Sequence, residues 1–262
     1  MKIGLVGCGL IGGSILKALQ GSGHDIYAWD QNDETNVQVA AAGLAQVDSP
    51  DTWAGIVDAV VLGVPMDFVP QVVSWIVPLM NPGSLLVDLS SIKRPVGQAL
   101  AWALKRVRVL SLHLMAGREI SGFERSDASL FRGCAAAVVD VGGAISELQS
   151  GVWWCQTLGA QEPTVWGLED HDAAMAWVSH LPYLVSQALG QAVAHGPHGV
   201  ANLAGPGFRD TTRVGRTDPS QLEPFLKANA AEVRRALAGL EAELHVWQTW
   251  LASVMASVVS AQ

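Results

Sequence analysis

The stretch "KIGLVGCGLIGGSILKALQGSGHDIYAWD", residues 2–30, decides the fold of this chain. Residues 2–6 are mostly apolar and lack helical spacing, which predicts a short buried strand. Residues 13–23 repeat apolar side chains at helical spacing, and residues 24–29 predict a second strand. A strand, a glycine-rich turn, a helix and a further strand in this order indicate one unit of an alternating α/β fold.

The turn between the first strand and the helix carries three glycines with different physical roles. Gly7 permits a tight turn, Gly9 lets the backbone approach a pyrophosphate, and Gly12 lets the helix pack closely on the strand. Leu10 and Ile11 lie at the helix start, where backbone amides without a helical partner can face phosphate oxygens. The pattern predicts a dinucleotide site, and we assign these five residues to it.

Asp30 ends the second predicted strand, about twenty residues beyond the glycines. Its carboxylate can accept hydrogen bonds from the adenine ribose hydroxyls and would repel a 2′-phosphate. No arginine follows it in "DQNDETN", which favours NAD as the cofactor; NADP stays open because other residues can hold the extra phosphate. Val64 and Pro65, at the end of a strand predicted over residues 59–65, complete the candidate cofactor site.

The rest of the first half continues to alternate between apolar runs typical of strands and amphipathic runs typical of helices. The further predicted strands are 84–91, 107–113, 134–141 and 163–168, and the predicted helices are 66–80, 94–106 and 145–159. Such alternation implies a mostly parallel sheet covered by helices on both faces. We therefore predict an α/β, doubly wound Rossmann domain over residues 1–168, with ligands beyond the carboxyl ends of its strands.

Residues 169–262 carry no strand signal and predict a C-terminal all-helical domain. Residues 171–196 predict a long helix that is kinked or broken near Pro182, and residues 222–259 predict another. These helices are more apolar than a single solvated layer requires. We therefore expect this domain to form a homodimer interface.

Between these helices, residues 205–219 form a predicted loop that contains Arg209, Arg213 and Arg216. Three arginines close together in a chain with net charge −8 indicate an anion site, although solvated surface arginines would give the same pattern. The acidic balance of the whole chain disfavours nucleic acid as a partner.

The cysteines and the apolar runs exclude several classes of protein. The three cysteines are widely spaced and fit neither a disulfide framework nor a metal site. The apolar run over residues 59–80 is interrupted by Asp67 and by prolines, so we expect no membrane span. We expect a cytoplasmic protein without a metal.

Five segments follow one another along the chain: "GLVGCGLIGGS", "DLSSIK", "HLMAGRE", "DHDAAMAWVSHLP" and "GPGFRDTTRV". Together they resemble the motifs of prephenate and arogenate dehydrogenases of tyrosine biosynthesis, and the chain looks closest to the compact cyanobacterial and plant arogenate dehydrogenases. The resemblance implies a Rossmann domain followed by a helical dimerisation domain. It also implies NAD(P)-dependent oxidative decarboxylation, in which a ring carbinol carbon transfers a hydride to nicotinamide and the ring loses CO2.

The resemblance assigns two candidate catalytic residues. His113 matches the family histidine that takes the proton of the ring hydroxyl, and Ser91 matches the serine that hydrogen-bonds this hydroxyl and aligns the histidine. Leu114 stands where the family usually has proline. From the residues alone, a histidine at a strand end is also compatible with a structural role, and Ser91 with a helix cap.

The resemblance also assigns substrate-binding residues in the second half. Arg213 matches the arginine that would hold the ring carboxylate in a bidentate pair, and Arg209 would support the same loop. His180 is a candidate for the pocket wall, with a satisfied core histidine as an equal alternative. Lys93 lies in the same motif as Ser91, and we interpret it as structural.

Tyr183 bears on the substrate, because prephenate-using members often have a second histidine at this position. A tyrosine hydroxyl provides no positive charge, whereas an acidic residue such as Glu119 or Asp210 would suit the ammonium group of arogenate. We also expect neither a fused mutase domain nor a regulatory domain. These features favour L-arogenate, with prephenate as the alternative; a 3-hydroxyacid or imine reductase, or a non-catalytic NAD-binding dimer, is a remoter alternative.

Overall fold

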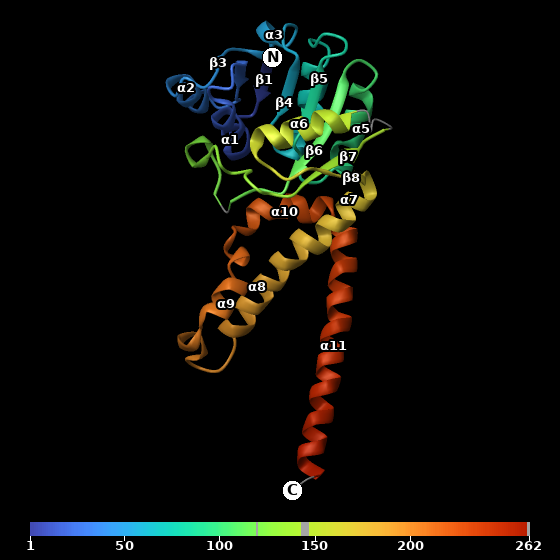
Figure 1. Ribbon diagram of the computed structural model, residues 1–262. Helices are drawn as coiled ribbons and strands as arrows, with labels where there is room; N and C mark the ends of the chain where they lie inside the picture. The colour runs from blue at the N-terminus through green and yellow to red at the C-terminus, as the bar shows by residue number, and fades with distance from the viewer. Residues whose placement is uncertain (119, 143–146, 261–262) are drawn as a thin grey trace. The chain divides into compact units, whose positions relative to one another are not determined.

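The computed structural model describes residues 1–118, 120–142 and 147–260, and the chain divides into two units, Met1–His171 and Asp172–Gln262. The first unit is a sheet covered by helices, and the second contains helices only within its described residues (Figure 1). An α/β domain followed by a helical domain was expected from the sequence, and this expectation is confirmed.

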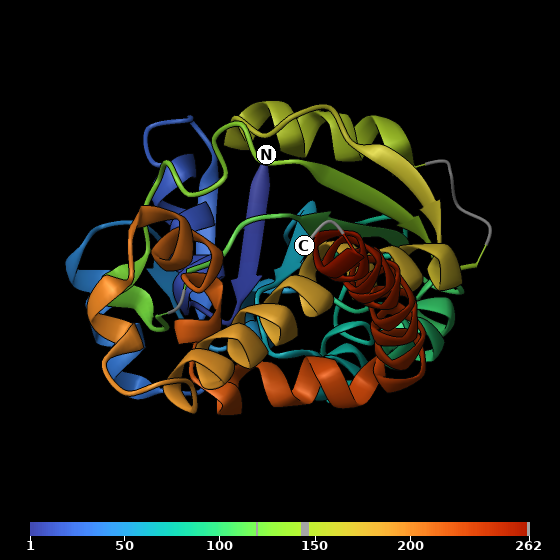
Figure 2. The same ribbon diagram turned by 90° about the horizontal axis from the view of Figure 1, so that it is seen from below.

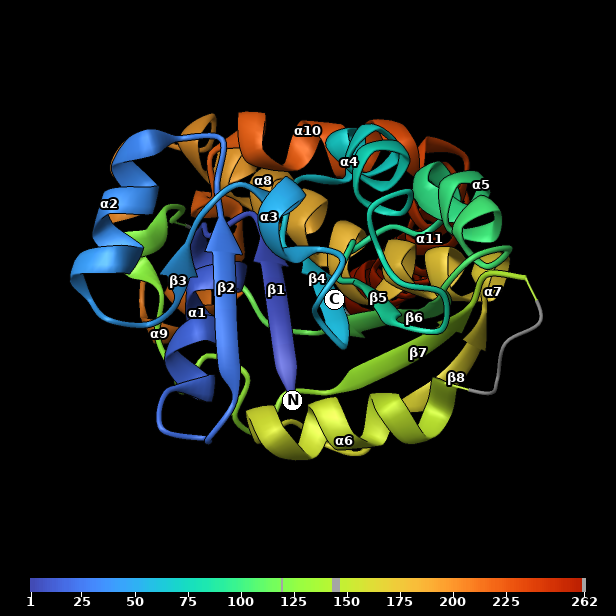
Figure 3. The same cartoon turned by 90° about the horizontal axis from the view of Figure 1, so that it is seen from above.

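Within the described residues, the first unit holds one eight-stranded sheet in the order β3-β2-β1-β4-β5-β6-β7-β8 (Figure 3). The strands are β1 (Lys2–Val6), β2 (Asp25–Trp29), β3 (Gln46–Val47), β4 (Ala59–Leu62), β5 (Leu85–Asp88), β6 (Arg108–Leu114), β7 (Ala136–Asp140) and β8 (Thr164–Gly167). All neighbouring strands are parallel except β6 and β7, which are antiparallel. The carboxyl ends of β1, β4, β5 and β6 therefore lie at one edge of the sheet, where ligands of such sheets bind.

Helices cover both faces of this sheet. Helices α1 (Leu10–Leu19) and α6 (Leu148–Leu158) lie on one face, and α4 (Val69–Ile76) and α5 (Arg94–Ala103) lie on the other (Figures 2 and 3). The shorter elements are α2 (Asp33–Ala41), α3 (Pro50–Trp53), η1 (Met66–Phe68) and η2 (Phe123–Arg125). The predicted covering on both faces is confirmed.

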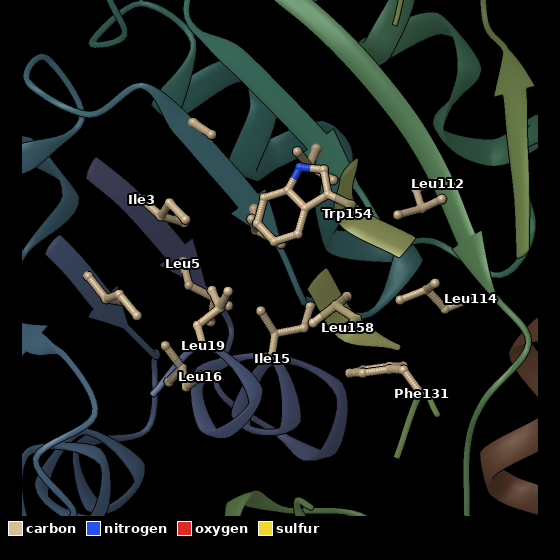
Figure 4. Packing of buried hydrophobic residues seen from close by; sticks show 14 of the residues in the cluster. Ile3, Leu5, Ile15, Leu16, Leu19, Leu112, Leu114, Phe131, Trp154 and Leu158 are labelled. Carbon is tan, nitrogen blue, oxygen red and sulfur yellow. The ribbon is translucent and has the colours of Figure 1, made fainter. Parts of the chain in front are cut away.

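The main hydrophobic core lies between the sheet and helices α1 and α6. Figure 4 shows Trp154 and Leu158 of α6 on the same side of the sheet as Ile15 of α1, with Leu5 of β1 among them. These side chains are at most 3% exposed. Each fully buried side chain of this size stabilises the fold by about 1.5–3 kcal/mol, so this packing fixes the strand ends that carry the candidate site.

The helical run that was expected over residues 171–196 is interrupted just before Pro182. Helix α7 (Leu168–Met175) continues into a π-helical turn, η4 (Ala176–His180), and then into α8 (Leu181–Ala194). Pro182 lies in the first turn of α8, where its missing N–H removes a backbone donor and favours such an irregularity. The predicted kink or break near this proline is confirmed.

Two predictions for the second unit were wrong. The predicted loop 205–219 contains helix α9 (Pro206–Thr211) and the 3-10 turn η6 (Val214–Arg216). The predicted helix 222–259 is two helices, α10 (Pro219–Ala228) and α11 (Ala230–Ser260), separated at Asn229. Asn229 is fully buried, and its side chain donates to the backbone oxygen of Asp172 over 2.6 Å, which fixes the break.

None of the described helices is both long enough and apolar enough to cross a membrane.

Candidate active site

The glycine turn after β1 has the shape that the sequence predicted. Gly7 has a positive φ of 90°, and a Cβ at this position would lie 2.8 Å from the backbone of Gly63. A Cβ on Gly12 would lie 1.9 Å from the carbonyl oxygen of Gly7, so the helix packs directly on the turn. A Cβ on Gly9 would meet no heavy atom within 4 Å. The open space beside Gly9 fits the close approach of a phosphate group to the backbone.

Asp30 follows β2 and is tied to this turn. Its Oδ2 accepts a hydrogen bond from the backbone N–H of Cys8 over 2.7 Å, and its Oδ1 accepts one from Asn32 over 2.9 Å. The carboxylate is half-buried at the carboxyl end of β2. An anion held here suits ribose hydroxyl groups and repels a further phosphate.

The remaining candidate cofactor residues border the same turn. Leu10 and Ile11 are half-buried in the first turn of α1, whose N-cap is Gly9 without a side-chain hydrogen bond. Val64 and Pro65 follow β4, where the backbone N–H of Gly63 donates to the oxygen of Val6 over 2.8 Å. The residues around the turn therefore fit a dinucleotide.

His113 lies near the carboxyl end of β6 and is only 8% exposed. Its Nδ1 lies 3.0 Å from Nε2 of His171, and the two rings meet edge to face at 66° with centroids 5.2 Å apart. His171 belongs to the first part of α7 and is 1% exposed. A buried imidazole with one nitrogen engaged by a second imidazole has a fixed ring orientation, which suits a group that exchanges a proton.

A buried ion pair holds the strand ends beside His113. The Nζ of Lys93 donates to Asp88 Oδ2 over 2.8 Å and to the carbonyl oxygen of Leu112 over 3.3 Å. The hydroxyl of Ser111 also donates to Asp88 Oδ2, over 2.9 Å, and that of Ser90 donates to Oδ1 over 2.5 Å. The pair thus connects the end of β5 to the two residues that precede His113.

Charge balance within this network favours the ionised carboxylate. Burial acts to raise the pKa of Asp88, but the Lys93 ammonium and the hydrogen bonds from Lys93 and Ser90 outweigh it and hold the pKa below its ordinary value. Both side chains are fully buried, so each ion needs the other.

Ser91 lies within the segment that this network holds. Ser91 is half-buried. Along the chain it follows Ser90, which donates to Asp88, and it precedes Lys93 by two residues. Lys93, and not Ser91, is the N-cap of α5, and it makes no side-chain capping bond. The helix-cap interpretation of Ser91 therefore finds no support in the geometry.

Candidate substrate residues of the second unit fall into two groups. Arg209 in α9 and Arg213 at the N-cap of η6 are exposed, as is Asp210 between them. His180 is 4% exposed and its Nδ1 lies 3.5 Å from the side-chain nitrogen of Asn229. Burial lowers the pKa of His180, although the Asp172 charge opposes this, so the ring favours its neutral form.

Tyr183 is 6% exposed in α8 and belongs to a small polar cluster of the second unit. Its hydroxyl lies 3.5 Å from the carbonyl oxygen of Thr217, and it accepts a hydrogen bond from Gln187 over 3.2 Å. Glu119, the other acidic candidate for the arogenate ammonium, lies outside the described residues.

Sequence reasoning did not select His171 or the Asp88 partner of Lys93 as part of the site. The signal for both was present, because "DHDAAM" contains a histidine between two acids and "DLSSIK" pairs an acid with a lysine five residues on. Among the described residues no cluster of histidine, cysteine or acidic side chains could hold a metal ion. Cys8 is also unsuited to chemistry, since burial and the Asp30 charge raise its pKa to about 12.

The fold and the glycine turn define the class: a protein with a Rossmann-type nucleotide-binding domain, followed by a helical domain. The family model for the nucleotide-binding domain of prephenate dehydrogenase matches residues 15–142, and the model for its dimerization domain matches residues 168–257. The chain belongs to the prephenate and arogenate dehydrogenase family, which acts in tyrosine biosynthesis.

Proteins named as arogenate, prephenate and cyclohexadienyl dehydrogenases each match most of this chain. A Synechocystis arogenate dehydrogenase structure is 26% identical with a TM-score of 0.82, covering 97% of this chain and 92% of its own. An Aquifex aeolicus prephenate dehydrogenase, solved with hydroxyphenyl propionate and NAD+, is 25% identical with a TM-score of 0.84, covering 96% and 91%. A cyclohexadienyl dehydrogenase of Zymomonas mobilis is 23% identical, covering 96% and 88%.

Proposed function

We propose that this protein is an NAD-dependent arogenate dehydrogenase that converts L-arogenate to L-tyrosine by oxidative decarboxylation. The observation that carries the proposal is the position of His113. It is buried at the carboxyl end of β6, at the edge of the sheet where the glycine turn also lies. Family membership supplies the reaction class.

The residues have separate roles in this reaction. His113 takes the proton of the ring hydroxyl through Nε2, since its Nδ1 faces His171. Ser91 hydrogen-bonds the same hydroxyl, and Arg213 forms a bidentate pair with the ring carboxylate. When bound beside the glycine turn, NAD+ would supply the hydride acceptor for the carbinol carbon. The bond from the ring to the carboxylate then breaks, its electron pair enters the ring, and the phenolate oxygen takes a proton back.

Arogenate and prephenate differ only in the side chain, which carries an ammonium group in arogenate and a keto group in prephenate. Tyr183 favours arogenate, because it stands where prephenate-using relatives often have a histidine that can bear positive charge. Prephenate is the second candidate, and the similarity to the Aquifex enzyme favours it.

The cofactor assignment depends on Asp30. Its carboxylate is fixed by Cys8 and Asn32, so it is available for ribose hydroxyls but cannot swing away from a 2′-phosphate without losing two hydrogen bonds. We therefore assign NAD as the cofactor and expect NADP to be used poorly.

The experiment that tests both assignments measures kcat/KM by reduced-cofactor absorbance for arogenate and prephenate, each with NAD and with NADP. The highest value is expected for arogenate with NAD. A higher value for prephenate would replace the substrate assignment, and a higher value for NADP would replace the cofactor assignment. No turnover in any combination would refute the proposed reaction.

We also propose that the protein is a homodimer formed through its second unit. The match to a dimerization domain over residues 168–257 supports this, as does the exposed apolar surface of α11.

A further inference from the structure

We infer that His171 is a positioning residue for His113, which it holds in the Nδ1-protonated tautomer so that Nε2 carries the lone pair. The inference rests on the proposed function, in which His113 takes the substrate proton. His171 itself need not touch the substrate, and its effect would pass through the imidazole of His113.

The first support is the geometry of the pair. The distance of 3.0 Å between Nδ1 of His113 and Nε2 of His171 is that of a hydrogen bond. The rings are 8% and 1% exposed, so water competes little for this contact. Both histidines interact with further groups as well, and the inference uses only the contact between the two.

The second support is the proton count of the pair. A neutral imidazole has one donor nitrogen and one acceptor nitrogen, so the short contact requires one ring to donate and the other to accept. If Nδ1 of His113 donates, its Nε2 is an acceptor and can take a proton. After it does so, the imidazolium still donates through Nδ1 to Nε2 of His171, and the contact survives the reaction step.

The chemical identity of the partner also matters. A carboxylate at this place would attract the imidazolium strongly and raise the pKa of His113. An imidazole accepts the same hydrogen bond without a full negative charge. The contact with His171 therefore does not hold the proton on His113 as a carboxylate would, and turnover requires that this proton be released.

The third support is that both rings are held from outside the pair. Lys93 donates to the carbonyl oxygen of Leu112, next to His113, and is itself fixed by Asp88. The helix of His171 begins at Leu168, whose side chain packs against Gly97 of α5 closely enough that a Cβ on Gly97 would lie 2.8 Å from it. The backbone of β6, which carries His113, and that of α7, which carries His171, are therefore each held by contacts outside the pair.

Three substitutions at one position test the inference through activity. His171→Leu removes the hydrogen-bonding group. His171→Gln places an amide near the position of Nε2, and His171→Asn, the matched control, carries the same amide one carbon shorter. We expect kcat to fall at least about tenfold for Leu and Asn, with KM for the substrate changed little, and to be largely restored in Gln. Wild-type kcat in His171→Leu, or equal kcat in Gln and Asn, would overturn the inference.

A second measurement requires neither substrate nor turnover. Nitrogen-15 histidine NMR of the wild-type protein reports which ring nitrogen carries the proton, and the spectrum of His113→Asn assigns the signal. We expect protonation at Nδ1 of His113; protonation at Nε2 would overturn the inference. Failure of the proposed function would look different, since the wild type would then turn over neither arogenate nor prephenate whatever the tautomer. If His171→Leu does not fold, the Gln and Asn comparison and the wild-type spectrum still decide.

Discussion

At the scale of single residues, two glycines of the turn after β1 have different roles. We expect Gly12 to be needed for folding and Gly9 to be needed for cofactor binding. Gly9→Ala adds a methyl group where no heavy atom lies within 4 Å, so the free energy of unfolding should stay within about 0.5 kcal/mol of the wild type. The same methyl group lies where a phosphate would approach. The dissociation constant for NAD should therefore rise at least about tenfold, as measured by fluorescence titration.

Gly12→Ala is the matched variant, because it adds the same methyl group 1.9 Å from the oxygen of Gly7. Here the turn or the helix must shift, and we expect a loss of about 1–3 kcal/mol in a denaturant titration. Unchanged NAD affinity in Gly9→Ala, or unchanged stability in Gly12→Ala, would contradict the roles assigned to them.

Arg213 and Arg209, which are both exposed in the second unit, allow another paired prediction. Arg213→Ala should raise KM for arogenate by about 10- to 100-fold and change kcat less, because the ring carboxylate loses a bidentate partner. Arg209→Ala removes a residue that supports the same loop without the bidentate contact, and it should raise KM less than Arg213→Ala does. Steady-state kinetics checks both, and an unchanged KM in Arg213→Ala would remove this residue from the carboxylate site.

Single residues with a local signature could be predicted from the sequence. The glycines could be recognised because their spacing imposes close backbone contacts, which the positive φ of Gly7 and the contact of Gly12 now show. The partnership of His113 with His171 could not, since 58 residues separate them and only the fold brings them together. The periodicity of a sequence predicts which face of a helix or strand a residue lies on. It does not predict which distant side chain the residue contacts.

At the scale of elements, the buried Asp88–Lys93 pair is a side-chain link between the end of β5 and β6. Lys93→Met should lower the free energy of unfolding by about 3–5 kcal/mol, because it leaves the carboxylate of Asp88 buried without its cation. Adding Asp88→Asn should recover much of that loss, since no charge then stays buried. Urea unfolding measures both variants, and equal stability of Lys93→Met and the wild type would contradict this role.

The same pair contributes a pH dependence with a definite sign. The pKa of Asp88 is lowered in the folded protein, so its contribution is fully present above the ordinary carboxyl pKa of about 4. This contribution to stability is lost as the pH falls from about 4 through the lowered pKa of Asp88. The double variant should therefore lose less stability than the wild type on acidification below about pH 4.

Elements with buried apolar runs could be predicted, whereas helices with little periodic signal could not. The strands predicted over residues 59–65, 84–91, 107–113 and 134–141 are all present with their ends shifted by at most three residues, because their burial requires an apolar run. The strand predicted over residues 163–168 is also present as β8, although its residues are exposed. Helix α2 buries only Val39, so its sequence gives little periodic signal. Helix α9 has six residues, too few for periodicity to distinguish it from a loop, and its Pro206 favours a helix start as well as a turn.

At the scale of the whole molecule, helix α11 carries large apolar side chains that the described residues of the chain leave exposed. Residues 241–258 are exposed throughout. The large apolar side chains of this segment are Leu244, Val246, Trp247, Trp250, Leu251, Val254, Met255 and Val258. Eight exposed large apolar side chains on one helix are typical of an interface between subunits, and they support the proposed homodimer.

Trp247→Glu should convert the dimer to a monomer, because it would place a carboxylate in the apolar interface. Thr249→Glu introduces the same charge about 200° around the helix and should leave the dimer intact. Sedimentation velocity over a range of concentrations distinguishes the two outcomes. A dimer of wild-type affinity in Trp247→Glu would exclude this face of α11 from the interface.

The division into an α/β unit and a helical unit could be predicted because the hydrophobic period changes once along the chain. The substrate could not be predicted. Arogenate and prephenate differ by one group, and the residue that contacts this group does not lie at a fixed distance along the sequence from the recognised motifs. Tyr183 illustrates the limit: the structure buries it beside Gln187 and Thr217, contacts that no local pattern encodes.

The most direct test of the central claim compares reduced-cofactor formation by the wild type and by His113→Asn, with arogenate and NAD, while NAD binding is measured in parallel. The wild type should turn over, and the variant should bind NAD with unchanged affinity but lose about 10²- to 10⁴-fold in kcat. Near-normal turnover in His113→Asn would contradict His113 as the proton acceptor, and an inactive wild type would contradict the proposed reaction.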